Sequence, residues 1–216
     1  MTIVRRFRSL NWWRFSPAQL LEKYAAHVFD KRFGTDTSTF VELGELEISG
    51  SNKRYGERYQ PSPVHSLRQL LKRLDIRYED FCFIDFGSGK GRTLLIAGEF
   101  PFKQVIGVEF SEILHRHGEQ NIQRYPHRAA TRVQSVHADA TTFQPPPDAL
   151  VAYFFNPFTL PVLERVLDKL VLSAAAVPRR IIVIYLYLPD ATWLSSREGF
   201  RLQEKRRNYH IFEYLA

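Results

Sequence analysis

The stretch FCFIDFGSGKGR, from Phe81 to Arg92, decides how this chain folds. An apolar run ends at Asp85-Phe86, a glycine-rich turn follows, and a helical pattern begins at Thr93. This layout predicts a strand, a tight loop and the first turn of a helix, an arrangement that can cradle a nucleotide-like ligand.

Two familiar glycine loops do not fit the stretch. A phosphate-binding Walker A loop is excluded because its first glycine would fall at Ile84, and because Gly91 follows the lysine where Ser or Thr is required. The dinucleotide fingerprint G-x-G-x-x-G would place its third glycine at Arg92, which has a bulky side chain. What remains is the pattern D-x-G-x-G-x-G.

That pattern resembles motif I of the class I S-adenosylmethionine-dependent methyltransferases. The resemblance implies that Asp85 binds the ammonium group of the cofactor, directly or through water. It also implies that the backbone of the loop passes close to the methionine part of the cofactor, at Gly87, Ser88, Gly89 and Gly91. The alternative is a glycine turn that only packs a strand on a helix.

A second match follows at Val105–Phe110, an apolar strand that ends in an acid. Glu109 lies 24 residues after Asp85, near the spacing at which a strand-end acid reaches a ribose. Its two carboxylate oxygens can accept from both ribose hydroxyls, with Phe110 beside them. Ser111 is the expected N-cap of the next helix. The alternative is an ordinary acid facing water.

A third match is Val133–Ala140. The family resemblance implies that Asp139 meets the adenine amino group and that Ala140 supplies backbone to the ring. Asp139 is also a common type of turn residue, so a purely structural role stays open.

The fourth match is Leu150–Phe158, an aromatic strand that ends in Asn-Pro-Phe. It resembles motif IV of amino-group methyltransferases, which implies that Asn156 anchors the acceptor nitrogen and that Phe158 packs against it. This chain has the single Pro157 where the family often has two prolines, and the difference leaves the substrate class open. Proline also ends strands, so the motif is alternatively a simple strand stop.

The remaining patterns predict an α/β fold. A helix is expected from Leu160 to about Ala175 with Thr159 as its cap, followed by a buried parallel strand at Ile181–Leu188. Strands near Phe200–Arg206 and Tyr209–Leu215 are expected to form a hairpin. With the family resemblance, this implies a Rossmann-like, doubly wound, mostly parallel seven-stranded sheet with helices on both faces and an antiparallel C-terminal pair.

We divide the chain into an N-terminal extension, residues 1–79, and an S-adenosylmethionine-binding methyltransferase domain, residues 80–216. The extension is expected to hold a basic, aromatic arm over residues 1–15, a helix from Pro17 to Asp30, a lid-like loop over residues 33–63 and a helix from His65 to Leu74. The arm is suited either to packing on the core or to contacting a partner or a membrane surface.

The segment before motif I carries a second, shorter resemblance. Tyr59-Gln60-Pro61-Ser62-Pro63 is similar to a segment of the seven-strand histone-lysine methyltransferases and of a mitochondrial lysine methyltransferase type. That resemblance implies that Tyr59 and Ser62 close over the cofactor. A plain turn explains the same residues.

Composition narrows the setting. The 216 residues contain one cysteine, Cys82, so no internal disulfide can form, and a cytoplasmic location is expected. We find no apolar segment long enough to span a membrane and no metal-ligand cluster. The net charge of +7 favours acidic partners such as RNA, membranes or acidic proteins.

These observations predict an S-adenosyl-L-methionine-dependent methyltransferase that acts on an amine nitrogen, with a protein lysine first among acceptors, then a small-molecule amine, then RNA. Four tyrosines are expected to shape the acceptor pocket: Tyr59, Tyr153, Tyr185 and Tyr187. Two alternatives from other classes are an NAD- or nucleotide-binding oxidoreductase and a non-catalytic binding protein that has kept the methyltransferase fold.

Overall fold

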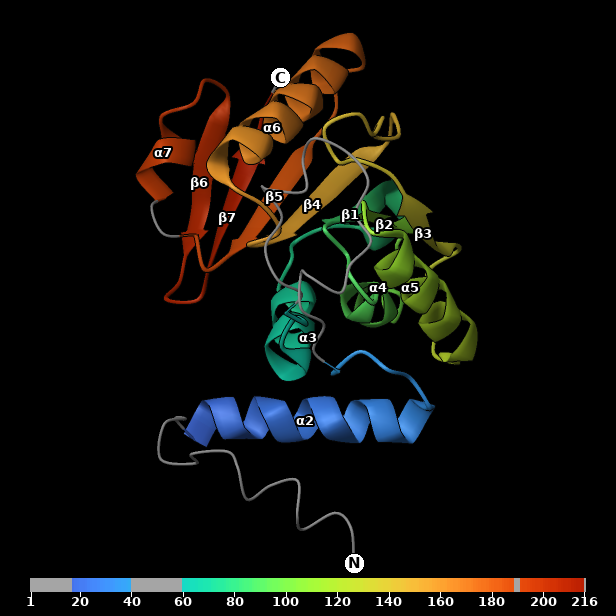
Figure 1. The fold of residues 1–216 in the computed structure, drawn as a ribbon. Coiled ribbons are helices and arrows are strands. Elements are labelled where there is room, and N and C mark those ends of the chain that lie inside the picture. Colours follow the sequence, from blue (N-terminus) through green and yellow to red (C-terminus); the bar gives the residue numbers. More distant parts are fainter. Residues whose placement is uncertain (1–16, 40–59, 189–190, 216) are drawn as a thin grey trace, which may run out of the picture.

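The computed structural model describes residues 17–39, 60–188 and 191–215 (Figure 1). The expected arm, Tyr59 and most of the expected lid-like loop lie outside the described residues. At the centre is one seven-stranded sheet in the order β3-β2-β1-β4-β5-β7-β6. Its strands are β1 (Phe81–Phe86), β2 (Gln104–Glu109), β3 (Val133–His137), β4 (Ala149–Phe155), β5 (Ile181–Leu186), β6 (Phe200–Lys205) and β7 (Tyr209–Tyr214).

The strand directions confirm the predicted fold class. β1 pairs in parallel with both β2 and β4, and β4 pairs in parallel with β5. β7 runs antiparallel to β5 and to β6, which makes the C-terminal hairpin. Chain order reverses between β1 and β4, and ligands of such sheets bind beyond the strand ends at this reversal. The carboxyl ends of β1 and β4 therefore mark the position of the site.

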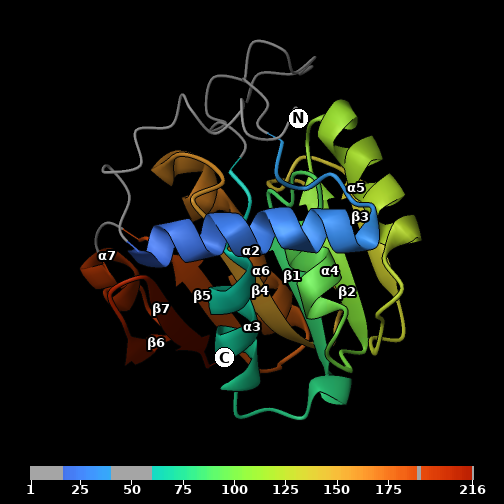
Figure 2. The ribbon, with the colours of Figure 1, turned by 90° about the horizontal axis from the view of Figure 1, so that it is seen from below.

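Helices cover both faces of the sheet, as Figures 1 and 2 show. On one side, α3, α4 and α5 share a core with Phe83 and Tyr153, and on the other α6 and α7 share a core with Cys82 and Phe154. The alternating directions of neighbouring side chains explain this division, because successive strand residues face opposite sides. The helices are α2 (Pro17–Phe33), α3 (Val64–Lys72), α4 (Arg92–Ala97), α5 (Glu112–Arg124), α6 (Leu160–Ala176) and α7 (Ala191–Ser195).

Helix α2 crosses over α3 and α4 as an outer element (Figure 2). Its Phe29 stacks on Tyr125 at a centroid distance of 5.4 Å, and both belong to the same core as the sheet residue Phe83. The described part of the N-terminal extension is therefore packed on the core of the α/β sheet. The domain boundary between residues 79 and 80 stays a prediction. None of the described helices is both long and apolar enough to cross a bilayer.

The two predicted helix caps behave differently. Ser111 caps α5 as predicted, accepting a hydrogen bond from the Leu114 amide at 3.4 Å. The prediction for Thr159 is wrong at the side chain: Thr159 precedes α6, but its hydroxyl makes no capping bond. The reason is local. Pro161 has no N–H, and the amides of Val162 and Leu163 already donate to the Thr159 carbonyl at 3.1 Å.

Candidate functional site

The glycine loop after β1 is a left-handed turn. Gly87, Gly89 and Gly91 have φ angles of +83°, +53° and +82°, a region that only glycine enters at little cost. The amides of Gly87 and Ser88 donate to the Val108 carbonyl at 2.9 and 3.2 Å. These bonds hold the loop against the carboxyl end of β2.

The same loop touches the Asn-Pro-Phe motif. A Cβ atom on Gly87 would lie 2.5 Å from the Cβ atom of Pro157, far inside contact distance. Two motifs that are distant in sequence thus meet at the β1–β4 reversal. Glycine is needed at position 87 both for its φ angle and for this close approach.

Glu109 lies under the loop and is 2% exposed. One carboxylate oxygen accepts from the Gly89 amide at 2.8 Å, and the other accepts from the Ser111 amide at 2.9 Å. Burial raises the pKa of Glu109, and hydrogen bonds from the backbone amides of Ser111, Gly89 and Phe110 oppose that rise. Three of the roughly four acceptor sites of the carboxylate are thus occupied, which leaves one for a ligand hydroxyl. Glu109, the residue predicted to bind the ribose, is thus held in place by backbone amides of the glycine loop and of the start of α5.

Asp85 lies one residue before the end of β1 and is 3% exposed. Burial raises the pKa of Asp85 to about 7, the Thr93 side chain opposes that rise by a hydrogen bond, and the charge of Glu109 adds to it. Within the described ranges no Lys, Arg or His forms an ion pair with Asp85 or Glu109. Buried carboxylates are costly without a cation, so this pair fits a cationic ligand such as the ammonium group of S-adenosylmethionine.

A cavity of about 20 Å³ opens beside Asp85. It has room for a small group. Ser62 lines it, and the Ser62 hydroxyl lies 2.9 Å from the Tyr153 hydroxyl and accepts from Thr93 Oγ1 at 3.0 Å. The segment before motif I therefore reaches the predicted ammonium site through Ser62. Tyr153, expected in the acceptor pocket, is instead fully buried beneath Ser62.

The predicted adenine residues lie at the end of β3. Asp139 accepts from the amide and the hydroxyl of Thr141 at 2.8 and 2.7 Å, and the half-buried Ala140 follows it. A His137 ring nitrogen lies 3.0 Å from the Phe110 carbonyl, which ties the end of β2 to β3. Asp139 therefore stabilises the turn after β3, and its contact with adenine stays a prediction.

Asn156 is exposed just after β4 and has a φ angle of +45°. Asparagine tolerates this left-handed conformation better than most residues, yet it is still strained. Phe158 is half-buried, and its ring meets that of Phe154 edge-on at 6.2 Å. Asn156 is therefore exposed directly before Pro157, beside the Gly87–Pro157 contact, where a polar acceptor anchor is expected.

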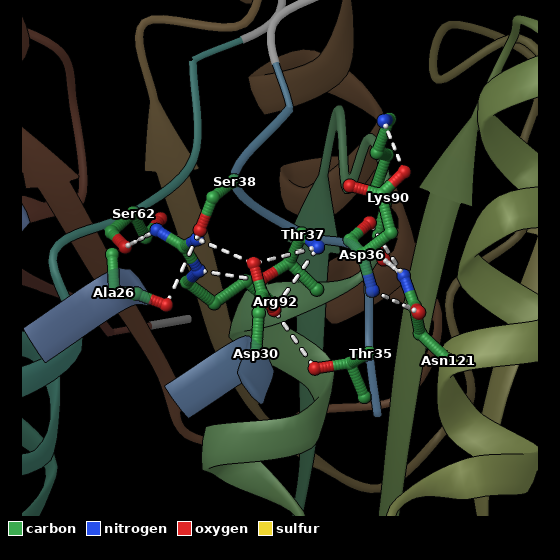
Figure 3. A network of polar contacts seen from close by, with 10 residues as sticks. All are labelled: Ala26, Asp30, Thr35, Asp36, Thr37, Ser38, Ser62, Lys90, Arg92 and Asn121. Carbon is green, nitrogen blue, oxygen red and sulfur yellow. Dashed lines mark hydrogen bonds and ion pairs between the residues drawn. The ribbon is translucent and has the colours of Figure 1, made fainter. Parts of the chain in front are cut away.

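Two cations of the glycine loop and the helix after it are buried, which no sequence pattern indicated: Arg92 is 3% exposed and Lys90 is 2% exposed. Both reach back to residues 35–38, which we call the strap (Figure 3). Arg92 Nε donates to Thr37 Oγ1 at 2.8 Å and Arg92 Nη2 donates to Ser38 Oγ at 2.6 Å. A third nitrogen, Nη1, donates to the Ser62 carbonyl at 3.3 Å. Arg92 therefore joins the strap to the segment that carries Ser62.

Lys90 and Asn121 hold the other end of the strap. Lys90 Nζ forms an ion pair with Asp36 at 2.9 Å. Asn121, on α5, accepts from the Asp36 amide at 2.9 Å, and its Nδ2 donates to the carbonyls of Asp36 and Lys90 at 3.0 and 2.9 Å. One sequence signal could have indicated these contacts: Lys90 in the glycine loop and Arg92 at the start of α4 are two cations in a motif without a phosphate-binding pattern.

The remaining expected tyrosines lie apart from one another. Tyr185 is buried in the core under α6, where its ring stacks on Phe154 at 5.8 Å. Tyr187 is 49% exposed at the end of β5. Across the described ranges 17–39, 60–188 and 191–215, no group of three or more His, Cys, Asp or Glu side chains could hold a metal ion.

Comparison with known proteins matches residues 23–138, more than half of the chain, to a family described as "Histone methylation protein DOT1". A fruit-fly (Drosophila melanogaster) protein named "Histone-lysine N-methyltransferase, H3 lysine-79 specific" is 38% identical over 110 residues. That match covers 48% of this chain and 6% of the fly protein. The chain therefore corresponds to a small part of that relative.

Solved structures match over more of the chain. A proposed RNA methyltransferase from Pyrococcus horikoshii superposes with a TM-score of 0.52 at 18% identity, covering 80% of this chain and 94% of its own. A ribosomal protein L11 methylase from Lactobacillus delbrueckii gives a TM-score of 0.50 at 14% identity, covering 73% and 80%. At such identities these likenesses show the fold alone.

Proposed function

This chain belongs to the DOT1 family of histone methylation proteins, and on that premise we propose that it moves a methyl group from S-adenosylmethionine to the side-chain amine of a protein lysine. The family is one of S-adenosylmethionine-dependent methyltransferases, as the glycine motif predicted, which sets the oxidoreductase alternative aside. The fly relative is named for a lysine of histone H3, and we propose a lysine in a protein as the acceptor class here.

The observation that carries the proposal is the contact of Gly87 with Pro157. It brings the buried carboxylates Asp85 and Glu109, which suit the cofactor, next to Asn156, which suits the acceptor. Bringing two reactants together in a fixed orientation is the main means by which such an enzyme accelerates a direct displacement.

The roles of the side chains follow from their chemistry. When bound, S-adenosylmethionine supplies an electrophilic methyl group on its sulfonium. Asp85 would hold the cofactor's ammonium group and Glu109 its ribose. Asn156 has a carbonyl oxygen that can accept from a neutral amine and orient its lone pair. The amine must be neutral to react, so a water path or a base near Asn156 completes the proposal.

The test has two readouts. S-adenosylhomocysteine is titrated into the wild-type protein and into Glu109→Gln, with NAD⁺ as the control ligand. We expect saturable binding to the wild type, none of NAD⁺, and binding to Glu109→Gln weakened roughly tenfold or more, about 1.4 kcal/mol. Absence of S-adenosylhomocysteine binding would overturn the cofactor assignment.

For the acceptor, labelled S-adenosylmethionine is incubated with histone H3, nucleosomes, a protein extract and RNA, and methyllysine is sought by mass spectrometry. Asn156→Ala is the control, expected to bind cofactor normally and to transfer little label. Label found in RNA or in small amines would refute the lysine proposal while leaving the cofactor in place. We also keep a cytoplasmic location as a proposal, because Cys82 is a free, buried thiol.

A further inference from the structure

A second hollow, larger than the cavity at Asp85, lies between α3 and the ends of β5 and β7. We call it the α3 groove, and its volume is about 560 Å³. Its apolar side is formed by Pro63 and Tyr187, with Leu67, Leu70 and Leu186 buried behind them. Its polar side includes three arginines, Arg73, Arg206 and Arg207.

The α3 groove adjoins the candidate site. Pro63 lines the groove and directly follows Ser62, which lines the Asp85 cavity. On the other side, the Tyr187 ring in the groove lies 5.6 Å from the ring of Phe155, which lines that cavity. A chain lying in the groove would therefore pass beside the Asp85 cavity and beside Phe155, which directly precedes the expected acceptor anchor Asn156.

The charge of the α3 groove is positive. Its described lining residues include no carboxylate. Of two nearby acids, Glu204 accepts from Arg206 Nε at 2.6 Å and from the Tyr209 hydroxyl at 3.1 Å, and Glu22 accepts from the amides of His65 and Ser66 at 3.1 and 3.0 Å. Both acids are already engaged within the protein.

The pKa of Glu204 is lowered mainly by its hydrogen bond from Arg206 and in smaller part by the charge of Arg73. Arg73 and Arg207 are exposed, and neither forms an ion pair with any described residue. Guanidinium groups bind carboxylates through paired hydrogen bonds, so exposed arginines beside an apolar floor suit an acidic chain.

A strained residue marks the same place. Tyr187 has a φ angle of +56°, and its ring is half exposed at the end of β5. A bulky residue is strained in this left-handed conformation, and such strain is concentrated at functional sites. The strain presents an aromatic ring to the groove, where it can contact a bound chain.

We propose that the α3 groove binds an acidic stretch of the acceptor protein that flanks the lysine to be methylated. This inference rests on the proposed function and deepens it, because it names the acceptor sequence by its charge. The half-buried Pro63 and the exposed Tyr187 ring, which lie over the buried Leu67, Leu70 and Leu186, suit protein side chains. Single-stranded RNA would favour a platform of stacked aromatic rings, whereas the two tyrosines of the described lining, Tyr187 and Tyr209, do not stack on each other.

The test uses two fluorescent peptides of equal length with one central lysine, flanked either by Asp and Glu or by Ser and Gln. Binding and methylation are measured with the wild-type chain, with Arg73→Glu and with Arg207→Glu. Arg132→Glu is the control, because it makes the same charge change at an exposed residue just before β3. S-adenosylhomocysteine affinity is measured for every variant.

We expect the wild type to prefer the acidic peptide by at least tenfold in kcat/KM, with the preference falling as salt is raised. Each groove variant is expected to raise KM for the acidic peptide about tenfold and to leave kcat and cofactor affinity unchanged. Equal binding of both peptides, an equal effect of Arg132→Glu, or competition by RNA in place of the acidic peptide would overturn the inference. Because peptide binding is read directly by fluorescence, the result stands even if no methyl transfer is found, and such a failure would count against the proposed function alone.

Discussion

Gly87 at the end of β1 and Pro157 after β4 lie so close that a single added methyl group would overlap the proline ring, with 2.5 Å between the two Cβ positions. The strands that carry them are neighbours in register, with Phe86 opposite Phe154. The contact therefore follows from strand pairing, and it fixes the distance between the cofactor loop and the acceptor motif.

Gly87→Ala is expected to disturb both motifs. The substitution forces a side chain into a left-handed conformation and against Pro157, so we expect a loss of roughly 2 kcal/mol in the free energy of unfolding and cofactor binding at least tenfold weaker. The control is Gly34→Ala, where φ is +64° but no atom lies within 4 Å of the added Cβ. Urea unfolding and calorimetric titration measure both quantities. If Gly34→Ala weakened cofactor binding equally, the contact would not be the cause.

Arg92→Gln is expected to release the strap. The guanidinium is 3% exposed, bonds Thr37, Ser38 and Ser62, and forms an ion pair with the largely buried Asp30 at 3.7 Å. Its removal takes the cation from that carboxylate and a donor from the Ser62 carbonyl, which costs about 3 kcal/mol of unfolding free energy. Arg77→Gln, which removes an exposed pair with Asp80, is expected to cost less than about 0.5 kcal/mol. Chemical unfolding measures both, and equal losses would show that the strap contacts add no stability.

Asp85 is expected to make the folded protein less stable as pH rises. Its folded pKa of about 7 lies above the unfolded value of 3.8, so between these limits the folded state binds more protons and stability falls with rising pH. A cationic ligand reverses this preference by favouring the ionised carboxylate, so affinity for S-adenosylhomocysteine should increase from pH 5.5 to 7, by at most about tenfold per unit. Asp85→Asn should flatten both profiles. An unchanged profile in the variant would assign the titration to another group.

His210 is expected to make the folded protein less stable as pH falls, which is opposite to the effect of Asp85. It is 7% exposed on β7, and neither ring nitrogen has a hydrogen-bond partner in the described structure. Burial and the charge of Lys205 lower the pKa of His210. Below the ordinary histidine pKa the unfolded chain binds a proton that the folded chain resists, so stability falls as pH falls. His210→Phe should keep stability at pH 7 and lose less of it at pH 5, as measured by thermal unfolding at each pH.

Local patterns in the sequence were a sound guide to the fold. The glycine loop, the four strand-end motifs and the C-terminal hairpin were predicted because apolar periodicity and glycine spacing act over a few residues. The cap at Thr159 was mispredicted because Pro161 and the Thr159 carbonyl together remove the donors that the hydroxyl needs.

The polar contacts across the site were beyond prediction. Ser62 was expected near the cofactor by resemblance, yet nothing in its neighbours indicates the Tyr153 hydroxyl, 91 residues away in sequence. Likewise, the position of Lys90 in a glycine loop does not indicate that Asp36 is its ion-pair partner. Such contacts depend on how whole helices and strands pack together, and short sequence patterns carry no information about that packing.

The strap has a consequence for how the chain folds. Asn121 is hydrogen-bonded to Asp36, 85 residues away in sequence, and Arg92 is hydrogen-bonded to Thr37, 55 residues away. Contacts this distant along the chain close large loops and form slowly compared with helices and hairpins. The pairing of β1 with β4 closes a loop of similar size, because Phe81 and Ala149 lie 68 residues apart. The strap therefore belongs with the central pairing of the sheet among the slow, long-range steps, and a chain that is interrupted between α2 and β1 is expected to lose the anchors of its glycine loop.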